Sequence, residues 1–200
     1  MTDAITQKGF VIHPGFLDRP AQEALVDRLR EVLARAPLFT PRTRRGPMSV
    51  RMSAAGTFGW YSDSKGYRYE RRHPDGMDWP PIPEEVLTIW RGVSGCARLP
   101  ECCLINWYSE GARMGLHRDE DEADFSCPVI SVSLGDEGLF RMGNVDRGGK
   151  TSSIWLKSGD VVVMGGEARL AFHGVDRIRF GSSTLLPNGG RINLTLRVVT

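Results

Sequence analysis

The sequence has few cysteines, and they are not arranged as a disulfide framework. None of the four cysteines stands in a CxxC pair, and two of them, Cys102 and Cys103, are adjacent. Adjacent cysteines are poor partners for disulfide bonds, and structural disulfides are rare where thiols are kept reduced. The pattern predicts a protein of the reducing cytoplasm, without a disulfide framework; the four residues are Cys96, Cys102, Cys103 and Cys127.

Long apolar runs, targeting signals and repeats are also missing. No apolar run approaches the length that crosses a bilayer, and residues 1–16 lack the basic-then-apolar order of a secretory signal. The chain contains no internal repeat and no low-complexity tract. At 200 residues, with 40% hydrophobic and 25% charged residues, it can bury one good core. We expect a soluble monomer, a single domain spanning residues 1–200, with no membrane contact.

The net charge of +2 hides an uneven distribution of charge. Residues 42–72 carry eight basic side chains and two acidic ones, so this segment has a charge of +6 and the remainder −4. Aromatic side chains are interleaved with these cations, as a groove that stacks unpaired bases and follows phosphates would require. An alternative is a twisted hairpin, turning at residues 64–66, whose aromatics serve only packing. The aromatics are Phe58, Trp60, Tyr61, Tyr67, Tyr69 and Trp79.

Two helices are predicted in the first hundred residues. The first runs from about Pro20 to Arg35 and begins near Asp18, and the second follows Pro83 and ends at Gly95. Both have apolar residues on one face, so we expect them to buttress the core and to carry no chemistry.

The segment NWYSEGARMGLHRDED, residues 106–121, contains two metal-capable side chains separated by a single residue. In a strand, His117 and Asp119 would share one face, whereas in a helix they would point apart. One imidazole and one carboxylate are two thirds of the 2-His-1-carboxylate triad that binds Fe(II). The alternative is a solvated pair in a loop, and the triad requires a second histidine downstream.

His173 is the better candidate for that second histidine. It follows two apolar runs, residues 161–163 and 170–172, which are split by Gly165 and Gly166 as in two core strands joined by a turn. His73, in contrast, lies in a polar turn with no predicted strand to orient it.

The C-terminal segment RINLTLR, residues 191–197, alternates polar and apolar side chains. This pattern predicts a half-buried strand with two arginines on its polar face. Their Cα atoms would be about 20 Å apart, leaving a gap suited to an extended dicarboxylate, and each guanidinium matches a carboxylate. The alternative is an edge strand with solvated arginines. The polar face would carry Arg191, Asn193, Thr195 and Arg197.

Taken together, the ordered motifs resemble the AlkB family of Fe(II)- and 2-oxoglutarate-dependent dioxygenases, which remove alkyl groups from nucleic-acid bases. The resemblance covers about residue 48 to the C-terminus and rests on Asn106-x-Tyr108, Gly111, His117-x-Asp119, His173 and Arg191-x-Asn193-x-x-x-Arg197. It implies a mainly β protein with flanking helices, of the α+β class, built on a double-stranded β-helix or jelly-roll. Residues 1–100 would form the N-terminal helices and a nucleotide-recognition lid, and residues 101–200 the dioxygenase core.

The resemblance also implies roles for individual residues. The metal ligands, and hence the catalytic residues, would be His117, Asp119 and His173. The 2-oxoglutarate site would consist of Asn106, Tyr108, Arg191, Asn193 and Arg197. The base-contacting residues would be Trp60 and Tyr67, with Met52, Tyr69, Asp121 and Arg147 as further candidates. Asp121 would also share the face of Asp119 if the strand continued, and could accept a hydrogen bond from an exocyclic amine.

The activity implied is oxidative demethylation of alkylated bases, of the 1-methyladenine and 3-methylcytosine type, with Fe(II), 2-oxoglutarate and dioxygen and with release of formaldehyde. The partner would be alkylated DNA, single-stranded, with RNA as a second candidate. Two alternatives stay open: a related 2-oxoglutarate dioxygenase acting on a protein or small molecule, and a non-catalytic nucleic-acid-binding jelly-roll with a structural metal.

Overall fold

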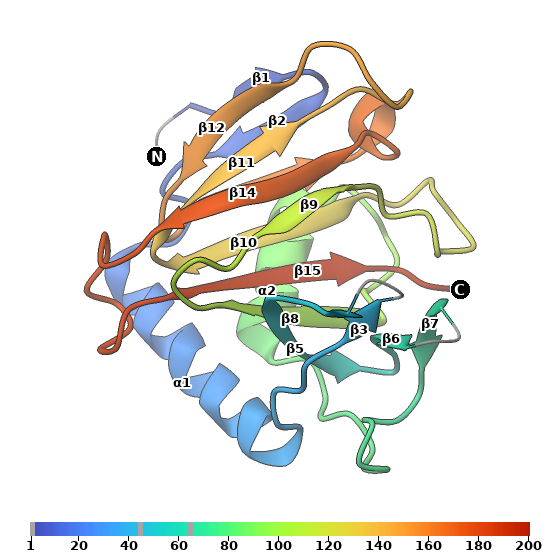
Figure 1. Ribbon diagram of the computed structural model, residues 1–200, viewed down its shortest axis with the longest axis vertical. Helices are drawn as coiled ribbons and strands as arrows, with labels where there is room; N and C mark the ends of the chain where they lie inside the picture. The colour runs from blue at the N-terminus through green and yellow to red at the C-terminus, as the bar shows by residue number, and fades with distance from the viewer. Residues whose placement is uncertain (1–2, 44–45, 64–65) are drawn as a thin grey trace.

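Two antiparallel sheets face each other in the computed structural model, which describes residues 3–43, 46–63 and 66–200 (Figure 1). In spatial order, the larger sheet consists of β1 (Ile5–Gln7), β2 (Phe10–His13), β13 (Val161–Met164), β10 (Val129–Gly135), β15 (Arg191–Arg197), β8 (Cys102–Tyr108) and β5 (Val50–Gly56). The smaller sheet consists of β12 (Ser152–Leu156), β11 (Glu137–Met142), β14 (His173–Arg179) and β9 (Met114–His117). The predicted jelly-roll is confirmed, and the first hundred residues contribute strands to it as well as helices.

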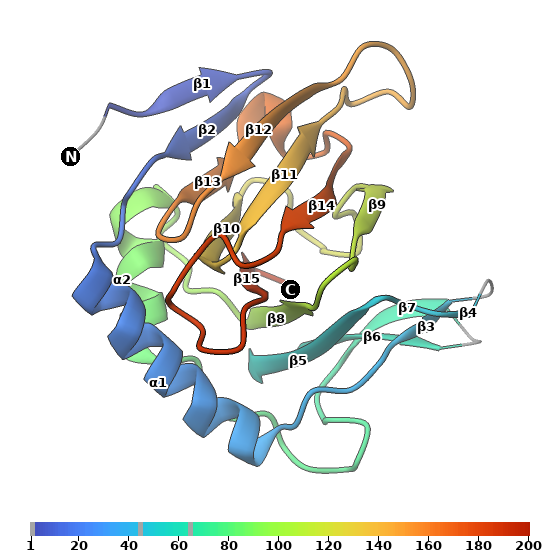
Figure 2. The same cartoon turned by 60° about the vertical axis from the view of Figure 1, so that its left-hand side comes forward.

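The two predicted helices cover the outer face of the larger sheet (Figure 2). Helix α1 (Arg19–Arg35) begins after Asp18, whose side chain accepts a hydrogen bond from the Ala21 amide and caps the helix. Helix α2 (Glu84–Val93) ends just before Gly95, as predicted. No helix among the described residues is long and apolar enough to cross a membrane. The side chains that the helices bury against the sheet include Leu25, Leu29, Val32, Val86, Ile89 and Trp90.

Strand β15 lies inside the larger sheet, paired with β10 on one side and β8 on the other. Its apolar residues pack in the layer beneath the helices, while its polar residues line a cavity between the sheets. The predicted alternation is therefore confirmed. The prediction of a half-buried strand was wrong, because neighbours on both edges and layers on both faces bury all seven residues.

The segment before His173 also differs from the prediction. Residues 161–163 belong to strand β13, but residues 170–172 form no strand; they follow a short 3-10 helix, η1 (Gly166–Ala168). Here the chain leaves the larger sheet and enters the smaller one at β14. Ala171 is buried in this crossing, so an apolar run marked a buried turn rather than a strand.

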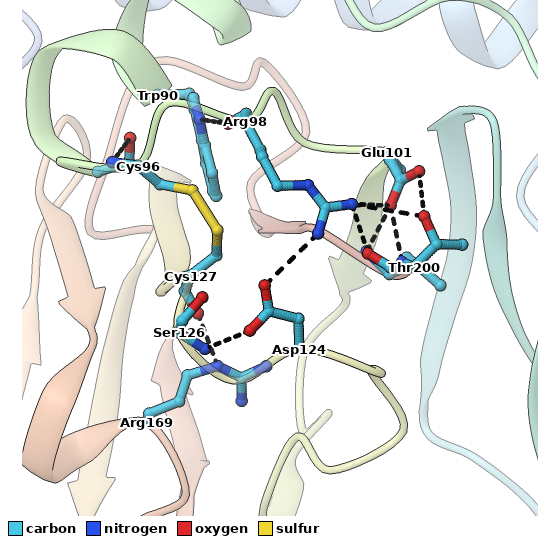
Figure 3. Close-up of a disulfide and its surroundings, with 11 residues drawn as sticks. Trp90, Cys96, Arg98, Glu101, Asp124, Ser126, Cys127, Arg169 and Thr200 are labelled. Carbon is cyan, nitrogen blue, oxygen red and sulfur yellow. Dashed lines mark hydrogen bonds and ion pairs between the residues drawn. A yellow bond between two sulfur atoms is a disulfide. The ribbon is translucent and has the colours of Figure 1, made fainter.

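The cysteine prediction was wrong for one pair. Cys96 and Cys127 form a disulfide, with Cα atoms 5.7 Å apart, whereas Cys102 and Cys103 on strand β8 are free and buried (Figure 3). The bonded residues are 31 positions apart, in segments that only the folded chain brings together, so their spacing carried no signal. The cysteine pattern consequently gives no support for a reducing environment.

A separate hairpin forms between strands β6 (Gly59–Asp63) and β7 (Gly66–Glu70), close to the short ribbon of β3 (Arg42–Thr43) and β4 (Gly46–Pro47) (Figure 2). Pairing of Asp63 with Gly66 confirms the predicted hairpin, although Ser64 and Lys65 of its turn lie outside the described residues. The hairpin carries Trp60 and Tyr67, and both side chains line the cavity between the sheets.

Candidate metal and cosubstrate site

Three metal-capable side chains meet at the edge of the smaller sheet. His117 and His173 are direct partners in the register of β9 and β14, and Asp119 follows two residues after β9 ends. One possible ligand atom from each lies within 4.8 Å of the others. Asp119 was expected on the strand itself. It lies instead in the loop that follows, but the two-residue spacing still brings its carboxylate to the imidazoles.

Both imidazoles are held with the same nitrogen facing the carboxylate. The Nδ1 atom of His117 lies 2.9 Å from the Gly115 carbonyl oxygen, and that of His173 lies 3.1 Å from the Ala171 carbonyl oxygen. A carbonyl only accepts, so each Nδ1 donates, and in the neutral form of each imidazole the Nε2 is then the nitrogen that carries the lone pair. The Nε2 atoms lie 3.9 and 3.8 Å from the two carboxylate oxygens of Asp119. This orientation by backbone carbonyls is typical of histidines that bind metals.

The electrostatics of the three groups also suit a cation. Burial opposes the charge on Asp119, but the guanidinium of Arg197 and the two imidazoles outweigh it and hold the pKa of Asp119 well below its usual range. Burial, with His117 nearby, lowers the pKa of His173 to about 4, so its imidazole is neutral at neutral pH. The Oδ2 atom of Asp119 is buried and has no hydrogen-bond partner among the described residues. An ionised carboxylate with an unpaired oxygen and a neutral imidazole fit a divalent metal.

The NxY and RxN motifs come together because their strands are neighbours. In the register of β8 and β15, Tyr108 is paired with Arg191 and Asn106 with Asn193. Two-residue spacing on each strand then places all four side chains on the cavity face. Burial raises the pKa of Tyr108 to about 12 and lowers that of Arg191 to about 10. Tyr108 is therefore a neutral donor, and Arg191 is a cation, at neutral pH.

Arg191 is fully buried and held from several sides. Its guanidinium donates to Ser133 Oγ at 2.7 Å and to the Asp136 carbonyl oxygen at 3.2 Å, but its Nε has no hydrogen-bond partner in the described part of the chain. Gly138 gives it room, since a Cβ there would lie 2.9 Å from that Nε. The Nε–H of the buried Arg191 guanidinium is thus available to donate a hydrogen bond to a group in the cavity.

Arg197 contacts a predicted metal ligand directly. Its Nη2 donates to Asp119 Oδ1 at 2.8 Å, and its Nε lies 3.4 Å from a carboxylate oxygen of buried Glu122. Its Nε and Nη1 atoms make no hydrogen bond to any residue that the structure describes. Five buried side-chain atoms lack a hydrogen-bond partner in the part of the chain that the structure describes, and all belong to predicted site residues: Asn106, Asp119, Arg191 and Arg197.

These groups line a cavity of about 310 Å³ between the sheets. At its mouth, Trp60 stacks on Tyr67 with ring centroids 5.3 Å apart, and the Trp60 indole donates to Asp121 at 3.2 Å. Met52 and Arg147, which the sequence predicted as contacts of the base, also line the cavity. Tyr69 is not part of the lining that the described residues form, and its hydroxyl donates to Glu122.

Sequence reasoning passed over several residues of this site. Ser131 and Ser133 on β10 bond Asn193 and Arg191, and the alternation of VISVSLG could have revealed them. Glu122 and Arg169 form a buried ion pair at 3.0 Å beside Asp119, and their spacing in the sequence gives no sign of it. His73, the histidine set aside, is buried against Phe39 and Trp79 away from the cavity.

The sequence and the fold of this chain are similar to those of known proteins. Residues 9–197 match the model of the 2OG-Fe(II) oxygenase superfamily. A relative from Caulobacter vibrioides, an alpha-ketoglutarate-dependent dioxygenase AlkB homolog, is 53% identical over 191 residues, which cover 94% of this chain and 87% of that protein. A DNA N(6)-methyladenine demethylase from Arabidopsis thaliana is 30% identical over 96% of this chain but 49% of its own length. The solved structure of OsALKBH1 has a TM-score of 0.80 at 31% identity, covering 96% of this chain and 98% of that chain.

The family model spans nearly the whole chain, and the Caulobacter relative is aligned over most of both sequences. The jelly-roll and the His-Asp-His cluster agree with these matches. The chain therefore belongs to the AlkB family of 2OG-Fe(II) oxygenases and is an Fe(II)- and 2-oxoglutarate-dependent dioxygenase.

Proposed function

We propose that this dioxygenase oxidatively demethylates alkylated bases, of the 1-methyladenine and 3-methylcytosine type, in single-stranded DNA and also in RNA. The observation that carries the cofactor part of the proposal is the set of unpaired buried atoms on Asn106, Asp119, Arg191 and Arg197. Buried polar groups are normally hydrogen-bonded, so a concentration of unpaired ones around one cavity indicates bound groups that complete them.

His117, Asp119 and His173 would hold Fe(II), leaving positions open for 2-oxoglutarate and dioxygen. When bound, these groups supply the oxidation of the alkyl carbon. Arg191 and Arg197 stand at opposite ends of β15, so a dicarboxylate between them would meet a guanidinium at each end. Tyr108 and Asn106 would add a neutral donor and an amide along its length.

At the cavity mouth, Trp60 and Tyr67 would bind the alkylated base by stacking. Their rings stack on each other at an interplanar angle of 19°, so a base would displace Tyr67 or enter beside it, against the face of Trp60. The hydrogen bond from the indole to Asp121 orders both side chains. Asp121 is then positioned to accept a hydrogen bond from an exocyclic amine of the base. Met52 and Arg147 would complete the walls of this end of the cavity.

Single-stranded substrates are favoured because the target base must leave its stack to enter the cavity. Extrusion costs least for a base that is unpaired or that pairs poorly, as a base methylated on its pairing edge does. Oxidation of the N-methyl group to N-hydroxymethyl, followed by cleavage of the bond between nitrogen and carbon, restores the base and releases formaldehyde. The Arabidopsis relative named as a DNA demethylase supports a nucleic-acid substrate.

A dioxygenase acting on a protein or small molecule would share the triad and β15 but would not need stacked aromatics at the cavity mouth. The decisive test is formaldehyde release from matched DNA and RNA oligonucleotides carrying 1-methyladenine or 3-methylcytosine, supplied with Fe(II), 2-oxoglutarate and ascorbate. Unmethylated oligonucleotides serve as the control. Succinate formation that no methylated oligonucleotide stimulates, with no formaldehyde from any of them, would contradict the proposal.

A further inference from the structure

One buried arginine contacts four residues of the loop that carries Asp119. This metal-ligand loop, residues 118–128, joins β9 to β10 and contains neither helix nor strand. Asp119 therefore lacks the backbone ladder that holds His117 and His173. Something else must fix its position, because a facial triad requires all three ligands in a defined geometry.

Arg169 supplies that support from a position 4% exposed. Its Nη1 donates to the Asp119 carbonyl oxygen at 2.8 Å, its Nη2 to Glu122 Oε2 at 3.0 Å, and its Nε to the Cys127 carbonyl oxygen at 3.0 Å. The guanidinium also lies over the Phe125 ring, 5.0 Å from its centroid. One planar group thus contacts the loop at four positions.

The backbone of Arg169 belongs to the other metal-binding segment. It follows η1 directly and precedes His173 by four residues. The side chain consequently bridges the segment that ends in His173 to the loop that carries Asp119. Glu122, the acidic partner in this bridge, is buried and also accepts from Tyr69 of β7.

Figure 3 shows a second arginine on the opposite side of the same loop. Arg98 lies near Asp124 at 3.5 Å and near Glu101 at 3.7 Å, and its side chain is 45% exposed. The Cys96–Cys127 disulfide also ties this loop to Cys96. Arg98 therefore contacts the loop without reaching Asp119 or Glu122, which makes it a matched control.

We propose that Arg169 is a positioning residue that fixes Asp119 relative to His173 and thereby sets the affinity of the triad for a divalent metal. The inference rests on the assignment of His117, Asp119 and His173 as the metal site. Three donors leave one rigid plane in different directions, an arrangement that the single ammonium of lysine cannot reproduce. Groups that orient metal ligands typically contribute 10- to 100-fold to metal affinity.

The test is titration of the metal-free protein with Co(II), followed by the absorption bands of the bound ion, so that no turnover is required. Parent, Arg169→Lys and Arg98→Lys are compared at a temperature where circular dichroism shows each to be folded. We expect Arg169→Lys to bind Co(II) about 10- to 100-fold more weakly, with altered bands, and Arg98→Lys to match the parent. Glu122→Gln, which removes the charge of the partner but keeps its shape, should shift the affinity in the same direction.

The outcomes separate the possibilities. If folded Arg169→Lys binds Co(II) like the parent, the arginine serves stability alone and the inference fails, while the metal assignment stands. If neither Arg169→Lys nor Glu122→Gln folds without metal, a purely structural role is shown and the inference is again overturned. If the parent itself binds no Co(II), or if His117→Ala binds it equally well, the proposed metal site is wrong.

Discussion

Arg197 donates a hydrogen bond to Asp119 over 2.8 Å, so a residue predicted for the cosubstrate also holds a predicted metal ligand. Arg191, at the other end of β15, instead contacts Ser133 and the Asp136 carbonyl group. Loss of Arg197 should therefore disturb the metal ligand Asp119, whereas loss of Arg191 should not. The sequence motif alone gives no sign of this difference.

Replacement by lysine should reveal this difference. Arg191→Lys and Arg197→Lys both give up the planar fork, so both should weaken 2-oxoglutarate binding substantially. Only Arg197→Lys should also weaken metal binding, because only Arg197 contacts Asp119. Calorimetric titration with 2-oxoglutarate, and with Co(II) alone, measures the two effects separately. Equal metal affinity in both variants would show that the contact with Asp119 has no energetic role.

Loss of either histidine should abolish metal binding and turnover together. His117→Ala and His173→Ala each leave two ligands, which cannot hold the facial geometry. Asp119→Asn keeps the shape of the side chain but removes the negative charge that balances the metal cation, so we expect a severe loss of metal binding and turnover in this variant as well. The measurement is Fe(II) retained after gel filtration, with His73→Gln as the control since His73 lies away from the cavity. Full activity in any of the three triad variants would remove that residue from the metal site.

Trp60→Ala should separate binding of the nucleic acid from the chemistry at the iron. Losing one stacked aromatic costs about 1 to 3 kcal/mol, roughly tenfold to a hundredfold in apparent affinity for a methylated oligonucleotide. Conversion of 2-oxoglutarate to succinate without oligonucleotide should persist, because Trp60 lies at the mouth of the cavity. Trp155→Ala is the control, since Trp155 lies on strand β12 and does not line the cavity among the described residues. Loss of both activities in Trp60→Ala would show that the indole is needed for folding.

The buried thiol of Cys102 should make stability fall in alkali. Burial raises its pKa from 9.0 to about 12, so below pH 9 the thiol is protonated in both the folded and the unfolded chain. Between pH 9 and 12 only the unfolded chain releases the proton, and the free energy of unfolding decreases by about 1.4 kcal/mol per pH unit for this group. Urea unfolding from pH 8 to 10.5 should show a shallower decline for Cys102→Ala than for the parent. Parallel slopes would contradict the burial of the thiol.

The parts of the site that periodic patterns encode were predictable from the sequence. The two-residue spacings in NxY and RxN survive in the fold because a strand repeats every two residues, and register then aligns β8 with β15 and β9 with β14. In HxD only His117 lies on a strand, and Asp119 reaches the imidazoles from the loop that follows. The Arg169 contacts and the Cys96–Cys127 disulfide join loops, where no period relates a residue to its partner. Residues 170–172 were wrongly predicted as a strand, because a buried turn and a strand can have the same apolar composition.

The two-sided pairing of β15 has a consequence for how this enzyme can change. A shift of one residue in its register would replace every cavity-facing polar side chain with an apolar one. No shifted register of β15 would therefore keep the polar lining of the cavity. Evolutionary adjustment of this strand is therefore restricted to substitutions in place. The β6–β7 hairpin has no such constraint, since its two strands pair only with each other among the described residues. Insertions or altered aromatics there could redirect substrate choice while leaving the oxidation machinery intact.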